Sequence, residues 1–260
     1  MLSFGKKLCY NHAGGMQMYT DLIFDLYGTL VDIHTEEDAL VWEKTALYFG
    51  FYGAKYTGEE LHAAFDEAMQ QRQAGAGQSY ECFPEIPVEQ VMAQLFREKG
   101  IGDADTLGMN AAQLFRIASI EYIRLYPWVK EALQHLRQKG YRLWLLSNAQ
   151  RAFTAYELRY LGLEDVFDGI YISSDYQCRK PDVRFYQALL QERQLDPATC
   201  LMIGNDRETD IAGAKAAGLD TLYMHTNLTP ADQAAANTRK RGHHREFEGY
   251  DWKKIVKKIG

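Results

Sequence analysis

Short runs of apolar residues alternate along this chain with longer segments of helical periodicity. Five runs have the length and composition of buried strands, and they span residues 22–24, 141–146, 169–172, 200–203 and 221–224. Apolar positions between these runs recur every three to four residues, as in Val129, Leu133 and Leu136, with Gly140 as a helix stop. This alternation predicts an α/β fold with a parallel sheet of about five or more strands.

Three further helices follow from the same periodicity. One spans residues 181–191 and has Pro181 in its first turn, and another spans 209–217 and is stopped by Gly218. The last places Trp252, Ile255, Val256 and Ile259 on one face, which predicts an amphipathic helix that closes the core.

The segment 33–122 has helical spacing throughout, without strand-like alternation. Its apolar positions fall into three groups, which are Leu61, Phe65 and Met69, then Val88, Val91 and Leu95, then Leu114, Ile117 and Ile120. A glycine-rich linker at 75–79 separates the first helices from the later ones. We therefore expect a helical cap domain at 33–122, inserted into a Rossmann-like core formed by 19–32 and 123–260.

An aromatic-rich stretch lies early in this segment. It contains Tyr48, Phe49, Phe51, Tyr52 and Tyr56. We expect these rings to pack between helices, with lining of a substrate pocket as the alternative.

Both ends of the chain lack an obvious chemical role. Residues 1–18 show no periodicity and are predicted to be a flexible leader. The basic run 238–245 lacks interleaved aromatic residues, so we interpret it as a solvated loop rather than a nucleic-acid contact. His243 and His244 lack a nearby third ligand for a metal ion.

Composition narrows the class of protein. The 260 residues carry a net charge of −6 and 47% apolar residues, which favours a globular protein over a nucleic-acid binder. No apolar segment approaches the length that spans a membrane. The four cysteines form no C-x-x-C pair, so we expect reduced thiols and a cytoplasmic protein.

Four short polar motifs follow predicted strands or precede predicted helices. They are Asp25-Leu26-Tyr27-Gly28-Thr29, then Ser147-Asn148, then Arg179-Lys180-Pro181-Asp182, then Asn205-Asp206 with Asp210. Each motif alone also fits an ordinary turn, helix cap or surface lysine. Because the carboxyl ends of parallel strands share one edge of a sheet, the four together predict one ligand site there.

These motifs, in this order, resemble those of the haloacid dehalogenase-like hydrolase superfamily over about residues 19–226. The resemblance implies a Rossmann-like core, a helical cap inserted after the first motif, and Asp25 as the nucleophile. It also implies that Lys180 neutralises the nucleophile and the substrate anion. Substrate phosphate would be bound by Gly28, Thr29, Ser147, Asn148 and Lys180. An ionised aspartate is a usable nucleophile at neutral pH, and aimed donors suit a developing oxyanion.

The fourth motif resembles a magnesium-binding motif. The implied ligands of Mg²⁺ are Asp25, Asn205, Asp206 and Asp210, and Mg²⁺ prefers such oxygen donors. This chain departs from the usual pattern because Asn205 stands where the first aspartate of the motif falls. Which of Asn205, Asp206 and Asp210 reaches the metal stays open at this point.

Tyr27 stands where phosphatases of the superfamily carry a second aspartate, the general acid and base. The same tyrosine is found in the metal-independent 2-haloacid dehalogenases, where halide leaves without a proton. Those enzymes, however, use an arginine early in the cap, and here Arg72 is the first arginine after Asp25. Carboxylates at Asp25, Asp206 and Asp210 would also repel one another without a cation.

We therefore predict a Mg²⁺-dependent phosphatase that acts on a small phosphorylated metabolite through an aspartyl-phosphate on Asp25. Asp25, Tyr27 and Lys180 are the predicted catalytic residues. Tyr27 would be a poor base at pH 7, which favours phosphates whose leaving groups need little protonation. The alternatives are a 2-haloacid dehalogenase with Asp25 as nucleophile and a non-catalytic binding module.

Overall fold

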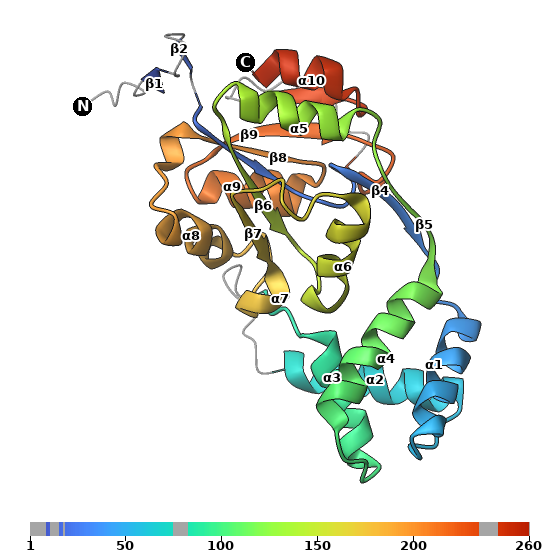
Figure 1. The fold of residues 1–260 in the computed structure, drawn as a ribbon. Helices are drawn as coiled ribbons and strands as arrows, with labels where there is room; N and C mark the ends of the chain where they lie inside the picture. The colour runs from blue at the N-terminus through green and yellow to red at the C-terminus, as the bar shows by residue number, and fades with distance from the viewer. Residues whose placement is uncertain (1–8, 11–15, 18, 75–82, 234–243, 260) are drawn as a thin grey trace.

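A six-stranded parallel sheet forms the centre of the computed structural model, which describes residues 9–10, 16–17, 19–74, 83–233 and 244–259 (Figure 1). The strands lie in the order β10-β9-β8-β3-β6-β7, and every pair is parallel. Their bounds are β3 Asp21–Phe24, β6 Arg142–Ser147, β7 Gly169–Ile172, β8 Cys200–Gly204, β9 Asp220–His225 and β10 His244–Glu248. The predicted α/β fold is confirmed.

The central position of β3 fixes the place of the first motif. Phe24 is in register with Leu145 of β6 on one side and with Ile203 of β8 on the other. The residues that follow these three strands therefore meet at one edge of the sheet. Chain order reverses there, because β6 and β8 lie on opposite sides of β3, and such a switch point is where open α/β sheets bind ligands.

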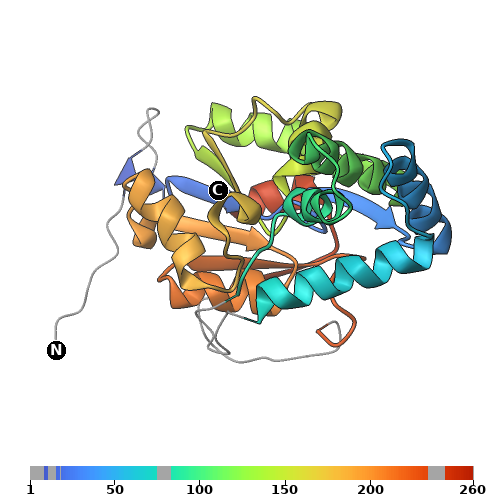
Figure 2. The same cartoon turned by 90° about the horizontal axis from the view of Figure 1, so that it is seen from below.

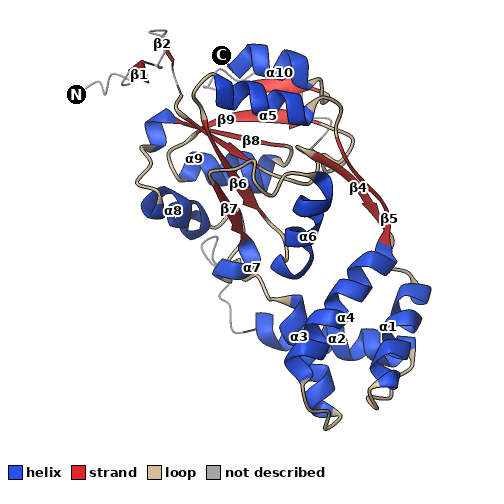
Figure 3. Cartoon of the chain, viewed as in Figure 1, coloured by secondary structure: helices blue, strands red, loops and turns tan. Residues whose placement is uncertain are grey.

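Alternating side chains of β3 divide the core between two faces of the sheet. Leu22 and Phe24 pack with α5 (Val129–Gln138), α6 (Arg151–Leu161) and α10 (Trp252–Ile259). Ile23 points to the opposite face and packs with α8 (Val183–Glu192) and α9 (Gly213–Ala216). Figure 3 shows helices covering both faces of the sheet. Every β3 residue is buried, and Leu22 to Phe24 form the apolar run that the sequence shows.

Four helices with their own core lie beyond the carboxyl ends of the strands (Figure 1; Figure 2). They are α1 Ala39–Phe51, α2 Gly58–Gln73, α3 Val88–Glu98 and α4 Ala104–Ser119. The rings of Phe49 and Phe96 stack at 3.8 Å between centroids, and those of Trp42 and Phe115 lie 4.7 Å apart. Most of the aromatic stretch packs in this core as expected, but Phe51 is 75% exposed.

The prediction of helix throughout 33–122 is wrong at both ends. β4 (Val31–Thr35) and β5 (Ile120–Leu125) form an antiparallel pair that joins the four helices to the sheet domain. This pairing spans about 90 residues of sequence, so local periodicity does not reveal it. The apolar face expected for α4 is also wrong, because Ile117 is 73% exposed. Ala111 and Phe115 face the core instead.

The ends of the chain also differ from expectation. Residues 9–10 (β1) and 16–17 (β2) pair as short antiparallel strands, so the predicted leader is structured there. His244 and Arg245 begin β10 instead of ending a loop, because parallel pairing with β9 is non-local. The rest of the leader, the linker 75–79 and residues 238–243 lie outside the described residues.

Shorter elements complete the described chain. They are α7 Ser173–Tyr176, the 3₁₀ turn η1 Pro197–Thr199 and the π-helical turns η2 Arg207–Ala212. The predicted helix 209–217 is thus part of η2 followed by α9. Within the described ranges, no helix combines the length and apolarity needed to cross a membrane.

The C-terminal helix α10 should contribute measurably to stability. Ile255 is fully buried against the core, whereas Lys257 on the same helix is exposed. We expect Ile255→Ala to lower the free energy of unfolding by about 2–5 kcal/mol through lost burial and cavity formation. Urea denaturation measures the change, and Lys257→Ala should stay within about 0.5 kcal/mol of the original chain. Equal effects of the two variants would contradict the assigned packing of α10.

Candidate active site

The four motifs predicted from the sequence meet at the carboxyl edge of β3, β6 and β8. A cavity of about 220 Å³ lies there. Its lining residues are Asp25, Tyr27, Asn148, Lys180, Asn205, Asp206, Thr209, Asp210, Leu228 and Pro230. The structure therefore brings residues of all four motifs to one place, and their roles remain proposals.

A buried ammonium group joins two of the motifs. Lys180 Nζ lies 2.8 Å from Asp25 Oδ1 and 2.6 Å from Asp210 Oδ1. Burial alone would lower the pKa of Lys180, but the charges of Asp210 and Asp25 outweigh it and raise that pKa. Lys180 thus stays charged at neutral pH and holds the two carboxylates together.

Asp210 is the more constrained of the two carboxylates. Its Oδ1 accepts from Lys180, and its Oδ2 accepts from the backbone N–H of Asp206 at 3.0 Å. Burial, with the nearby charge of Asp25, raises the pKa of Asp210 to about 7 in spite of Lys180. A further cation in this cavity would favour the ionised form.

Thr29 connects the first motif to the fourth. Its hydroxyl lies 3.2 Å from Asp25 Oδ2 and 3.3 Å from Asn205 Oδ1, and all three residues are buried. Gly28 has a φ of +83°, and a Cβ at this position would overlap the side-chain amide of Asn205. The Gly-Thr pair after Asp25 is therefore needed for this close approach of two loops.

The two residues of the second motif, Ser147 and Asn148, differ in their contacts. Ser147 is fully buried, and its Oγ has no hydrogen-bond partner among the described residues. Ser147 directly precedes Asn148, which lines the cavity, and a buried hydroxyl without a partner is suited to accept from or donate to a ligand. Asn148 instead holds the third motif, because its amide donates to the Lys180 carbonyl at 2.9 Å and accepts from the Lys180 N–H at 2.8 Å.

Asp206 lines the cavity but also caps a helix. Its Oδ1 accepts from the backbone N–H groups of Glu208 and Thr209 at 2.8 and 2.9 Å. Gln233 donates to the same oxygen at 3.3 Å. Oδ1 is thus committed to the start of η2, and a metal contact from Asp206 would have to come from Oδ2.

The hydroxyl of Tyr27 is held by two residues of α6. It donates to Glu157 Oε2 at 2.5 Å and lies 3.0 Å from Thr154 Oγ1. Arg116 of α4 donates to Glu157 at 2.6 Å and lies over the Tyr27 ring, with its Cζ 5.6 Å from the ring centroid. Burial, and then the charge of Glu157, raises the pKa of Tyr27 well above its ordinary value.

Sequence reasoning missed Arg116, Thr154 and Glu157. An arginine does reach the site from the cap, but from α4 near the end of the inserted segment. Thr154 and Glu157 lie three residues apart on α6, on the same side as the buried Leu158. Two polar residues beside an apolar helical face are the signal that could have drawn attention to them.

A second cavity adjoins the first between the sheet domain and the four helices. It has a volume of about 340 Å³ and shares Tyr27 and Asn148 with the cavity of Asp25. Its other lining residues are Ile33, Thr35, Glu85, Arg116, Ala149, Gln150, Phe153 and Arg179. A substrate bound at Asp25 has space for its non-reacting part here.

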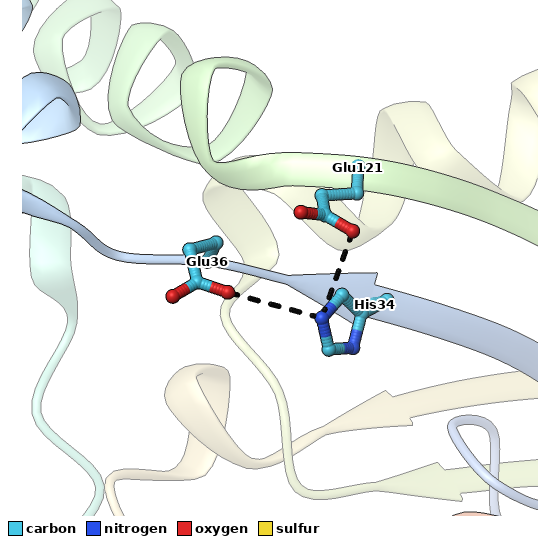
Figure 4. A group of neighbouring side chains, drawn as sticks. All are labelled: His34, Glu36 and Glu121. Atoms are coloured by element: carbon cyan, nitrogen blue, oxygen red, sulfur yellow. Dashed lines mark ion pairs between the residues drawn. The ribbon is translucent and has the colours of Figure 1, made fainter.

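A polar cluster also lies on the β4–β5 pair, away from this cavity. His34 Nε2 is 3.9 Å from Glu36 Oε2 and 3.7 Å from Glu121 Oε2 (Figure 4). All three side chains are exposed. The distances are those of a surface ion pair that joins the two connecting strands.

The sequence is similar to those of known hydrolases. The sequence model of the haloacid dehalogenase-like hydrolase family matches residues 22–218. The chain is 35% identical over 226 residues to phosphoglycolate phosphatase of Vibrio vulnificus, covering 83% of this chain and 88% of that protein. It is 28% identical over 217 residues to glyceraldehyde 3-phosphate phosphatase of Methanothermobacter thermautotrophicus, covering 83% and 90%.

The fold is also similar to that of 2-haloacid dehalogenase from Pseudomonas syringae. The TM-score is 0.63 at 19% identity, covering 93% of this chain and 99% of that one, which speaks for the fold alone. The similar proteins include both phosphatases and a dehalogenase, so the match defines the family and not one activity. This chain belongs to the haloacid dehalogenase-like hydrolases. The resemblance inferred from the four motifs is confirmed.

Gly28 offers a test of the site geometry with an internal control. Gly28→Ala adds a methyl group against Asn205, whereas Gly140→Ala, with a similar φ of +90°, meets open space. We expect both variants to lose about 1–2 kcal/mol of stability from the left-handed backbone. Only Gly28→Ala should also lose most of its kcat. Thermal unfolding and steady-state assays separate the two effects, and equal kcat values would contradict the close contact.

Proposed function

We propose that this protein is a Mg²⁺-dependent phosphatase that acts on a small phosphorylated metabolite. The observation that carries the proposal is the buried carboxylate of Asp25, held by Lys180 and Thr29 beside oxygen donors of the fourth motif. The names of the two curated relatives, both phosphatases, support it. The two adjoining cavities, of about 220 and 340 Å³, suit a small substrate.

Each residue around Asp25 has a separate role in the proposed phosphoryl transfer. An Asp25 oxygen attacks phosphorus and forms an aspartyl-phosphate, which water then opens. Lys180 pairs with the nucleophile and offsets the charge of the incoming phosphoryl group. Ser147 Oγ, which is buried and without a partner among the described residues, binds a phosphoryl oxygen together with nearby backbone N–H groups. Asn148 keeps Lys180 in place through its backbone.

The residues of the cavity fit a magnesium ion. Asp25, Asn205, Asp206 and Asp210 line it with oxygen atoms, the donors that Mg²⁺ prefers. The pKa of Asp210 is raised although Lys180 is adjacent, so one ammonium does not fully offset the buried negative charge. When bound, the ion would neutralise charge on the phosphoryl group.

A dehalogenase remains the second candidate because of two observations. Tyr27 lies two residues after the nucleophile, and Arg116 reaches the adjoining cavity from the cap. Glu157, however, binds Arg116 through both Nε and Nη2, so this guanidinium is already engaged by a carboxylate. An α-halocarboxylate would have to compete with that internal partner.

A paired assay separates the two activities. We expect phosphate release from 4-nitrophenyl phosphate that EDTA abolishes and added Mg²⁺ restores, because the buried carboxylates need a cation to bind a phosphate dianion. L-2-chloropropionate should give no chloride. Chelator-insensitive chloride release, without phosphate release, would show the dehalogenase instead.

Replacement of the nucleophile distinguishes both enzymes from a non-catalytic binding module. Asp25→Asn keeps the shape of the side chain but removes the anionic nucleophile, so kcat should fall by at least about 10³-fold. Asp32→Asn is a matched control, since Asp32 is also buried but binds Arg124 of β5 and Asn227, which follows β9. Unchanged biological function of Asp25→Asn would favour the binding module.

A further inference from the structure

The hydroxyl group of Tyr27 has no proton left for a substrate. Its single proton goes to Glu157 Oε2, a carboxylate oxygen that also accepts from Arg116. Thr154 must then donate to the Tyr27 oxygen across their 3.0 Å contact. Tyr27 therefore borders the cavity of Asp25 with its ring, while its polar end is fully engaged on α6.

This arrangement is held in place by a buried ion pair. The side chains of Glu157 and Arg116 are only 9% and 15% exposed, and Arg116 also lies over the ring of Phe153. Turning the Tyr27 hydroxyl toward Asp25 would leave Glu157 with one donor fewer in a buried position, which is costly.

The other ionisable groups around Asp25 are also committed. Asp210 accepts from Lys180 and from the Asp206 backbone, and Lys180 is shared by two carboxylates. Asp206 accepts two backbone N–H groups as a helix cap. These contacts fix both aspartate side chains as acceptors toward neighbouring donors rather than as proton donors toward a departing oxygen.

Glu85 is the remaining carboxyl group of the adjoining cavity, and burial raises its pKa. Both its oxygens, however, are hydrogen-bonded, one to Gln150 and the other to Ser173. Ser173 follows β7, which is two strands away from β3 in the sheet. Glu85 lines the adjoining cavity but is not among the residues that line the cavity of Asp25.

We propose that the natural substrate is an acyl phosphate, aryl phosphate or phosphoanhydride, whose leaving group departs as a stable anion. The inference rests on the proposed phosphatase function and narrows its substrate class. Asp25 forms a bond to phosphorus, and the bond to the leaving oxygen breaks with its electron pair, without protonation. Water then attacks the aspartyl-phosphate, Asp25 recovers its carboxylate, and the proton of the water ends on inorganic phosphate.

A series of phosphate esters tests this inference on the unmodified protein with Mg²⁺. The probes are 4-nitrophenyl, phenyl and ethyl phosphate, whose leaving groups are increasingly basic. Since a general acid typically contributes about 10²- to 10⁴-fold, we expect kcat/KM to fall by a similar factor from the first to the last. Equal values for all three would overturn the inference and leave the phosphatase function standing. No phosphate release from any of them would instead refute the proposed function.

Two substitutions at Tyr27 give a second, independent readout. Tyr27→Phe keeps the ring but removes the hydroxyl, so the ratio of aryl to alkyl rates should not change, whatever happens to the rates themselves. Tyr27→Asp supplies a carboxyl group and should raise ethyl phosphate hydrolysis relative to 4-nitrophenyl phosphate. A selective loss of alkyl phosphate hydrolysis in Tyr27→Phe would show that the hydroxyl does donate a proton, and would overturn the inference. The Phe variant keeps this test decisive if Tyr27→Asp fails to fold.

Discussion

The buried ammonium of Lys180, shared by Asp25 and Asp210, is the interaction on which the site depends. Burying a charge is expensive, and removing one partner of a buried ion pair typically costs about 3–5 kcal/mol. The fold meets this cost by bringing three loops to one edge of the sheet, where β3 lies between β6 and β8. Asp25, the proposed nucleophile, is thus held in place by Lys180, and the same ammonium group also holds Asp210 beside it.

A second ion pair, Arg116 with Glu157, determines what the first can do. It joins a cap helix to the sheet domain and binds the hydroxyl of Tyr27 away from the nucleophile. In the proposed mechanism, Tyr27 lines the cavity without taking part in proton transfer. The two ion pairs together are the basis for proposing a hydrolase that forms a covalent intermediate and selects substrates by their leaving groups.

Much of this was predictable from local sequence patterns. Apolar runs located five strands, and the polar residues after them located Asp25, Ser147 and Asp210. Non-local contacts were not predictable. The start of β10 was assigned to a loop, and most of β4 and the start of β5 were assigned to helix, because pairing between strands distant in sequence leaves no local pattern. The partners of Tyr27 were missed for the same reason. Arg116 is 89 residues away from Tyr27 in sequence, and the two residues are connected because both donate to Glu157.

The most direct test of the account is the identity of the covalent intermediate. The protein is mixed with Mg²⁺ and acetyl phosphate, quenched in acid within one turnover, digested and analysed by mass spectrometry. If Asp25 is the nucleophile, we expect one added phosphoryl group on the peptide that contains Asp25, and none in the Asp25→Asn variant. A phosphoryl group on another residue, or phosphate release without any adduct on Asp25, would contradict it.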